Sequence, residues 1–89
     1  MVNVKRIVLD VLKPHQPNAL EFSQAITEAG IDYRVKLVVI DVDENTETVQ
    51  VELKGNAINF NAVQSAITNM GGSIHSIDEV EVHNETMAN

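Results

Sequence analysis

The stretch YRVKLVVIDVDENTETVQVELKG, residues 33–55, decides the fold. It reads as two strands, at 33–42 and 47–55, joined by the turn residues DENT at 43–46. In the second strand, Val49, Val51 and Leu53 alternate with polar residues, which is typical of an antiparallel strand with one buried face. The elements on either side of this hairpin then set the topology.

A strand and a helix are predicted ahead of the hairpin. The β-branched run VKRIVLDVL, residues 4–12, indicates a strand, and KPHQP at 13–17 ends it because two prolines interrupt any regular element. The segment NALEFSQAITEAG, residues 18–30, indicates a helix with Asn18 as N-cap, Glu21 at the capping-box position and Gly30 at C′. The predicted buried face of this helix consists of Phe22, Ala25, Ile26 and Ala29.

A second helix and a last strand are predicted after the hairpin. Asn59 or Asn61 caps the helix, and Gly71 ends it in a left-handed conformation, so that Gly72 turns directly into the strand. This strand runs from Ser73 to about His83, and the tail NETMAN is expected to be disordered from about residue 84. The apolar face of the helix consists of Val63, Ala66, Ile67 and Met70.

The resulting order is βαββαβ, in one domain that spans residues 1–89. The helix segments QAITEAG and SAITNMG share Ala-Ile-Thr and a closing glycine, as a repeated β-α-β unit would. We therefore expect an α+β, ferredoxin-like fold. Its four-stranded antiparallel sheet has the order 4-1-3-2, with both helices on one face and the other face bare.

Composition narrows the possible partners. The formal net charge of −7 repels phosphate backbones and anionic membranes, so nucleic acid is a poor partner. The absence of cysteine excludes disulfides and thiolate metal sites. The start MVNVKRIVLD is too polar for a signal peptide and no stretch approaches a membrane span, so we expect a cytoplasmic protein without membrane contact.

The bare face of the sheet is expected to carry the interesting side chains. Strand alternation turns Asp10 outward in the first strand and His75, Ile77 and Glu79 outward in the last. One register then makes every outward pair complementary, namely Asp10–His75, Val8–Ile77 and Arg6–Glu79. Alternation leaves Asp78 facing inward, and a β-bulge around Asp78–Glu79 would relieve this.

This register suggests a metal site made of Asp10, His15 and His75, with Asp78 or Glu79 nearby. Imidazole and carboxylate together suit a divalent transition metal, with copper(II) favoured and zinc as an alternative. The competing interpretation is that Asp10 and His75 form only a cross-strand charge pair, while His15 caps a loop.

The acidic hairpin offers a separate candidate for calcium. Asp41, Asp43, Asn45 and Glu47 place oxygen ligands at alternate positions, as the first half of a calcium loop does. The central glycine and the distal glutamate of that loop are missing, so a solvated acidic turn is the alternative. Three residues near the C-terminus, His83, Glu85 and Met87, are not expected to be ligands.

The bare face also predicts self-association. Its apolar strip, consisting of Val8, Leu12, Val38, Ile40 and Ile77, is larger than a monomer usually leaves exposed. We therefore expect a homo-oligomer whose subunits cover part of this strip.

The segments LDVLKPHQP, residues 9–17, and GGSIHSIDEV, residues 71–80, give the chain a resemblance to an archaeal family known as domain of unknown function 211. The resemblance covers essentially the whole chain. It implies a ferredoxin-like domain that assembles into ring-like or other homo-oligomers, and a leaning towards metal binding, copper included. The residues that fall in the two segments are Asp10, His15, His75, Asp78 and Glu79, and the resemblance does not say which of them touch metal.

Two functional hypotheses follow. The first is a non-enzymatic buffer, store or carrier of a divalent metal, and the second is an oligomeric module for small-molecule sensing or assembly that needs no metal. An enzyme is disfavoured because there is neither a cysteine nucleophile nor a glycine-rich phosphate loop. Acylphosphatase activity would need an arginine in the loop after the first strand, and RNA recognition would need aromatic residues on the central strands. The sequence provides neither.

Overall fold

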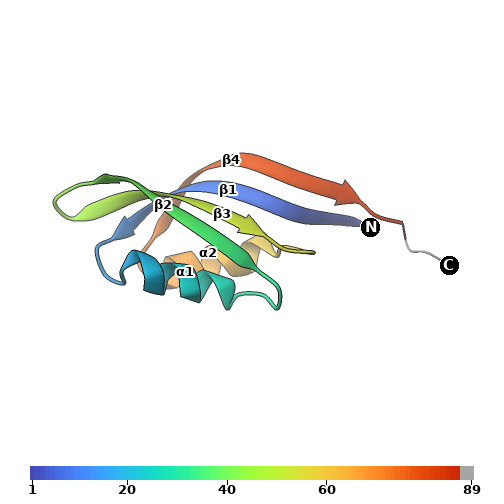
Figure 1. Cartoon of the computed structure of the whole chain (residues 1–89), viewed down its shortest axis with the longest axis horizontal. Coiled ribbons are helices and arrows are strands. Elements are labelled where there is room, and N and C mark those ends of the chain that lie inside the picture. Colours follow the sequence, from blue (N-terminus) through green and yellow to red (C-terminus); the bar gives the residue numbers. More distant parts are fainter. Residues whose placement is uncertain (87–89) are drawn as a thin grey trace.

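The computed structural model describes residues 1–86, and these form a single antiparallel sheet with two helices on one face (Figure 1). The elements are β1 (Val2–Pro14), α1 (Ala19–Thr27), β2 (Arg34–Val42), β3 (Thr46–Lys54), α2 (Phe60–Asn69) and β4 (Ser73–Asn84). The sheet order is β2-β3-β1-β4, so the predicted ferredoxin-like topology is confirmed. Among the described residues, neither helix is long and apolar enough to cross a bilayer.

The core lies between the helices and the two central strands. Alternation along β1 turns Ile7, Leu9 and Val11 towards the helices, where each is at most 3% exposed. Each helix contributes two fully buried side chains at a spacing of four residues, Phe22 and Ile26 on α1 and Val63 and Ile67 on α2. β3 completes the layer with the three apolar residues that its alternation predicted, Val49, Val51 and Leu53.

Both helices begin where the sequence predicted. The Asn18 side chain accepts a hydrogen bond from the Glu21 backbone N–H at 2.9 Å, and the Glu21 carboxylate accepts one from the Asn18 N–H, which makes a complete capping box. Asn59, rather than Asn61, caps α2 by accepting from the Ala62 N–H at 3.1 Å. The first orphan N–H groups of each helix are therefore satisfied locally.

The predicted role of Gly30 is wrong. Helix α1 ends at Thr27 with Glu28 as its C-cap, and Gly71 is the glycine with positive φ among the residues described. A Cβ on Gly30 would stand 2.3 Å from the ring of Tyr33, so this position needs glycine for a close approach and not for handedness. The Tyr33 hydroxyl in turn accepts a hydrogen bond from the Asn59 N–H at 2.8 Å. This bond links the loop before β2 to the start of α2.

Strands β1 and β4 are longer than the sequence suggested. β1 continues to Pro14, which pairs with Thr46 at the hairpin end of β3. β4 reaches Asn84, and the Glu85 N–H donates to the Met1 carbonyl at 2.6 Å, so residues 84 and 85 belong to a paired ribbon and not to a loose tail. Figure 1 shows this β1–β4 ribbon running past the helices towards both termini. Met87 lies outside the described residues.

The register between β1 and β4 differs from the predicted one. The Cα partners are Asp10–Ser76, Val8–Glu79 and Arg6–Glu81, with irregularities between Val4 and Arg6, between Val8 and Leu9 and between Asp10 and Val11. Asp78 and His75 are the extra residues of β4 at two of these sites. The bulge expected at Asp78 is confirmed, but a second one at His75 shifts the pairing, and Ile77 pairs with core-facing Leu9 instead of facing outward.

We expect Gly71→Ala to lower the free energy of unfolding by about 1 kcal/mol or more. Gly71 has φ +83, where an added Cβ meets the steric cost of a left-handed backbone although its nearest neighbour, Pro14, is at an ordinary 3.4 Å. Urea unfolding measures the loss, and Gly71→Asn is the matched control because asparagine tolerates this conformation better. Equal stability of the alanine variant and the wild type would contradict the assignment.

Candidate functional site

The structure brings Asp10 and His75 together on the helix-free face of the sheet. Both line a hollow of about 230 Å³, together with Thr48 and Leu12. Asp10 comes from the regular part of β1, whereas the bulge in β4 directs His75 to this face although His75 has no Cα partner on β1. Asp10 and His75 are therefore neighbours, as predicted. They are diagonal neighbours across the two strands, because the residue directly opposite Asp10 is Ser76.

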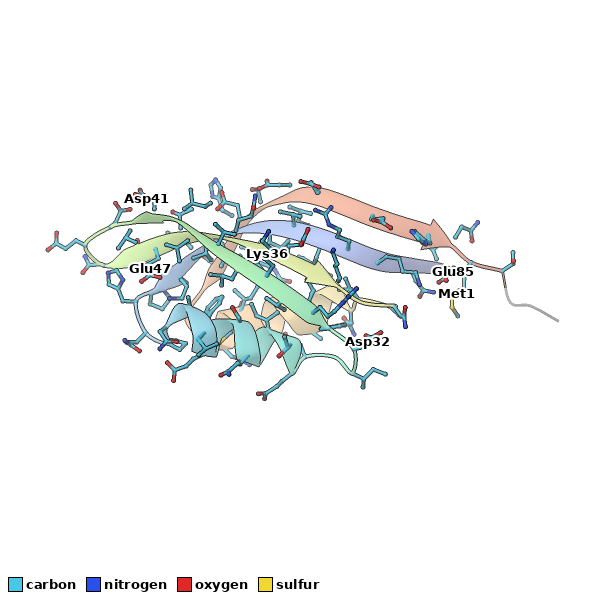
Figure 2. The ribbon with its side chains drawn as sticks, in the orientation of Figure 1. Met1, Asp32, Lys36, Asp41, Glu47 and Glu85 are labelled. Carbon is cyan, nitrogen blue, oxygen red and sulfur yellow. The ribbon has the colours of Figure 1, made fainter. Side chains whose placement is uncertain are left out.

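His15 lies elsewhere, which corrects the expectation that it folds back to the Asp10–His75 corner. Its Nδ1 lies 2.9 Å from Oε2 of Glu47, and its Nε2 lies 2.9 Å from the carbonyl oxygen of Glu44. Glu47 pairs with Lys13, whose side chain is fully buried on the helix-covered face. His15 is thus drawn to the β2–β3 hairpin, whose end is marked by Asp41 and Glu47 in Figure 2.

The surroundings of His15 favour its charged form. Both ring nitrogens face oxygen acceptors, and only the imidazolium donates from both nitrogens at once. The hydrogen bond to Glu47, followed by the one to the Glu44 backbone, raises the pKa of His15 above its ordinary value. The same contact with His15, and then the contact with Lys13, lowers the pKa of Glu47. A metal ion would have to displace one of these bonds to reach the ring.

The two acidic candidates on β4 are each held by another partner. The carboxylate of Asp78 accepts a hydrogen bond from the Ser76 hydroxyl at 2.7 Å. Glu79 forms an ion pair with Arg6 at 2.8 Å. Arg6 also forms an ion pair with Glu52 on β3 at 2.6 Å. The predicted Arg6–Glu79 charge pair is present although their Cα atoms are not partners.

The acidic hairpin and the C-terminal histidine form separate contacts. The hairpin closes through a 2.8 Å bond from the Asp43 N–H to the Thr46 carbonyl, and Glu47 points back to His15 and Lys13. His83 lies 2.7 Å from Glu81, and Glu85 binds Lys5 at 2.9 Å. Within residues 1–86, no three histidine or acidic side chains gather closely enough to hold one metal ion.

Sequence reasoning missed Lys13, which it assigned to the loop after the first strand. Its side chain is fully buried, with the ammonium 2.8 Å from the Pro14 carbonyl, 3.1 Å from Glu47 and 5.6 Å from the centre of the Phe22 ring. The alternation of Ile7, Leu9 and Val11, continued by one more step, places residue 13 on the core face. The sequence pattern was therefore sufficient to predict that Lys13 is buried.

The apolar strip expected on the bare face is interrupted. Val8 is only 3% exposed, because the charged side chains around it, Arg6, Lys36, Glu52 and Glu79, cover it. Long charged side chains often cover apolar surface in this way. Most exposed apolar side chains lie on the two edge strands of the sheet, and Val38 and Ile40 of the expected strip are among them.

Comparison with known proteins agrees with this architecture. The family model of domain of unknown function 211, described as uncharacterized ArCR, matches residues 5–88. The chain belongs to this family. It is also 41% identical over 80 residues to an uncharacterized protein of the archaeon Methanocaldococcus jannaschii, a match that spans 90% of this chain and 82% of that relative.

The two segments that carried the family resemblance lie side by side in the structure. Residues 9–17 form the end of β1 and the following loop, and residues 71–80 enter β4, which pairs with β1. In this member of the family, the segments meet at the second bulge, beside the Asp10–His75 hollow, whereas His15 projects from the far end of the first segment to Glu47.

We expect the His15 ring to titrate above the ordinary value of about 6.5 in an NMR pH titration. Because the folded-state pKa is raised, the contribution of His15 to stability is complete below the unfolded-state pKa and is lost as pH rises through the folded-state pKa. The difference in melting temperature between wild type and His15→Gln should therefore shrink between pH 6 and pH 9.

Glu47→Gln is the matched control for this titration. It removes the carboxylate that contributes most to the raised pKa of His15 but preserves the size of the side chain. The His15 pKa should then move down towards its ordinary value. An unchanged titration in Glu47→Gln would show that the His15–Glu47 contact does not persist in solution.

Proposed function

We propose that the chain is a non-catalytic subunit of a homo-oligomer that assembles edge to edge, with β4 of one copy beside β2 of the next. The observation that supports this most is the location of the exposed apolar side chains. Of the twelve large hydrophobic side chains exposed within residues 1–86, seven lie on the two edge strands. They are Val38, Val39, Ile40 and Val42 on β2, and Ile77, Val80 and Val82 on β4.

The strand directions support the same arrangement. β4 and β3 both run antiparallel to β1, and β2 runs antiparallel to β3, so the two edges β2 and β4 run in opposite directions. A copy placed head to tail beside another therefore brings β4 against β2 as an antiparallel pair. The contact is heterologous, and such a contact closes into a ring if the rotation between copies permits.

Edge pairing would also satisfy exposed backbone groups. A strand at the edge of a sheet carries a row of unpaired N–H and C=O groups that a second strand can bind. The regular stretch of β4 that follows its bulges begins at Glu79, and the regular stretch of β2 ends at Val39, before its own irregularity. These regular stretches hold Val80 and Val82 on one edge and Val38 and Val39 on the other.

We expect the wild-type protein to show masses that are multiples of the 9.8 kDa subunit in native mass spectrometry. Val80→Lys should reduce the assembly because it places a charge in the apolar edge of β4, and Ile40→Lys should do the same on β2. Leu20→Lys is the matched control, since Leu20 is 67% exposed on α1, away from both edges.

Mixing the two edge variants tests the head-to-tail contact itself. Each variant has one intact edge, so the mixture should form dimers that contain one copy of each and should not grow further. If Ile40→Lys alone still dimerises, the contact joins two β4 edges and the proposed arrangement is wrong. A monomeric wild type at micromolar concentration would reject the proposal altogether.

A second candidate function is divalent metal binding at Asp10 and His75. It is supported by the position of both residues in the lining of one hollow, together with Thr48. Carboxylate and imidazole suit copper(II) ahead of zinc, and the remaining ligands would come from water or from a neighbouring copy. The imidazole must be neutral to bind a metal ion, so affinity should weaken in acidic solution.

We expect His75→Ala to remove most copper(II) binding in calorimetry and to preserve the fold, because His75 is exposed at the edge of the sheet. His83→Ala is the control, since His83 contacts Glu81 at the other end of β4. Equal copper affinity in wild type and His75→Ala would exclude this site, and it would leave the proposal of edge-to-edge assembly untouched.

A further inference from the structure

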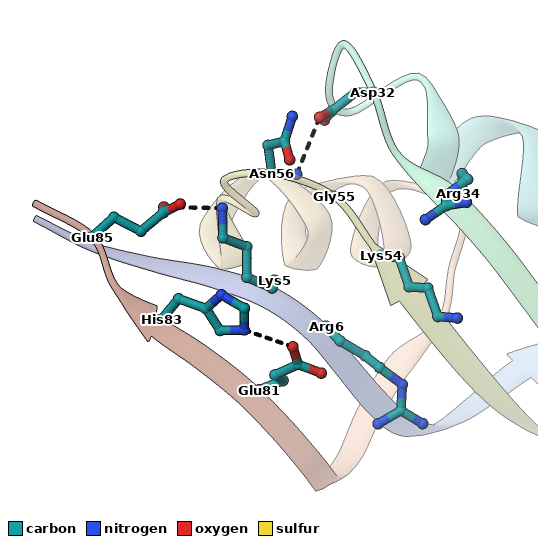
Figure 3. Close-up of a pocket in the computed structure, with 10 residues that line it drawn as sticks. All are labelled: Lys5, Arg6, Asp32, Arg34, Lys54, Gly55, Asn56, Glu81, His83 and Glu85. Atoms are coloured by element: carbon teal, nitrogen blue, oxygen red, sulfur yellow. Dashed lines mark hydrogen bonds and ion pairs between the residues drawn. The ribbon is translucent and has the colours of Figure 1, made fainter. Parts of the chain in front are cut away.

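Three cationic side chains form one row across the helix-free face of the sheet. Lys54 on β3 is the Cα partner of Arg6 on β1 and also of Arg34 on β2. Directly opposed residues in an antiparallel pair point to the same face, so the three cations stand side by side. Figure 3 shows them on three neighbouring strands, blue, olive and green.

The three cations are not equally neutralised. Arg6 is held between Glu52 and Glu79 at 2.6 and 2.8 Å. Arg34 and Lys54, in contrast, form no ion pair or side-chain hydrogen bond with any other residue in the described part of the chain. Like charges placed directly opposite each other destabilise a sheet. The Glu52 carboxylate, whose pKa Lys54 helps to lower, offsets part of this repulsion, but it is held by Arg6 and does not reach Arg34.

The row lines a hollow with a volume of about 620 Å³, larger than the hollow beside Asp10 and His75. This volume lies within the range of small-molecule sites in proteins. The acidic groups in its wall are already engaged: Glu85 with Lys5 at 2.9 Å, Glu81 with His83 at 2.7 Å, and Asp32 with the Asn56 N–H at 3.1 Å. Figure 3 shows these three contacts around the rim and none that reaches Arg34 or Lys54.

We propose that this hollow binds a phosphate group of a small molecule, with Arg34 and Lys54 as its cationic ligands. A phosphate monoester carries close to two negative charges near neutral pH, which matches the two unpaired cations. The guanidinium offers a planar fork for two phosphate oxygens, and the ammonium adds a point charge beside it. The binding would remove the repulsion between Arg34 and Lys54 that the empty row carries.

The rest of the hollow fits the remainder of such a molecule. Its volume exceeds what one phosphate needs, and its wall is polar, with Asn56 and His83 among the lining residues. The overall negative charge of the chain opposes anions at long range, so binding should depend on the short-range contacts and should weaken as salt rises. The inference does not rest on metal binding or on edge-to-edge assembly, although Arg34 lies on β2, one of the two edges that such an assembly would pair.

The test is a titration of the full chain with inorganic phosphate at low ionic strength. Binding is measured by calorimetry and by changes in the backbone amide NMR signals of residues 54–56. We expect saturable binding in wild type. In Lys54→Gln the affinity should fall by about tenfold or more, since a charge-assisted bond is lost. Lys36→Gln is the matched control. Lys36 on β2 likewise has no ion pair in the described residues. Its Cα partner is Glu52, one row away from Lys54, and it does not line this hollow.

Each alternative result would overturn the proposal. Absence of binding at millimolar phosphate rejects the site, and equal weakening in Lys54→Gln and Lys36→Gln shows a general charge effect. If Lys54→Gln alters the subunit number in native mass spectrometry while phosphate affinity is unchanged, these cations hold a second copy and not an anion. Arg34→Gln provides a second variant with the same expected loss, in case Lys54→Gln does not fold.

Discussion

The pairing of β1 with strands on both sides is the constraint on which the rest of the structure depends. β1 is the longest strand, and it binds β3 along one edge and β4 along the other. Its inner face supplies Ile7, Leu9 and Val11 to the core, against which both helices pack. Without β1, β4 would have no partner and the β2–β3 hairpin would lose the strand that joins it to the sheet.

The few cations of the chain reinforce this central strand. Lys5, Arg6 and Lys13 all lie on β1, and each forms an ion pair with a carboxylate of a neighbouring strand or of the segment that follows β4. Exposed pairs of this kind contribute little individually. Lys13 is different because it is fully buried, so loss of Glu47 would leave a charge in the core with only a carbonyl and an aromatic ring as partners.

The two faces and two edges of the sheet have different chemistry. One face is covered by helices whose exposed residues are largely polar, and the other face is dominated by charged side chains that cover Val8. Apolar side chains remain exposed mainly at the edges, β2 and β4. The edges are therefore the most apolar part of the exposed sheet, and the helix-free face is the most charged.

The bulges in β4 connect these features. Two extra residues, His75 and Asp78, let β4 stay paired with β1 over a long distance while the strand bends and twists. The bulge at His75 places its side chain beside Asp10, and the bulge at Asp78 brings Ile77 to the same face as Leu9. A regular strand would have presented a different set of side chains along this edge.

The sequence by itself determined the features that depend on interactions within a few residues. The alternation in β3, the helical spacing of Phe22 and Ile26, the Asn18–Glu21 capping box and the left-handed Gly71 were all predictable, and together they imply the element order and the sheet topology. Only the tertiary structure decided the register of β4, the close approach of Tyr33 to Gly30 and the direction of His15. These depend on partners far along the chain: Glu47 is 32 residues from His15, and the β1–β4 register joins the two ends of the domain. The choice between a regular pair and a bulge there follows from how both strands fit the twisted sheet, which no local pattern of residues records.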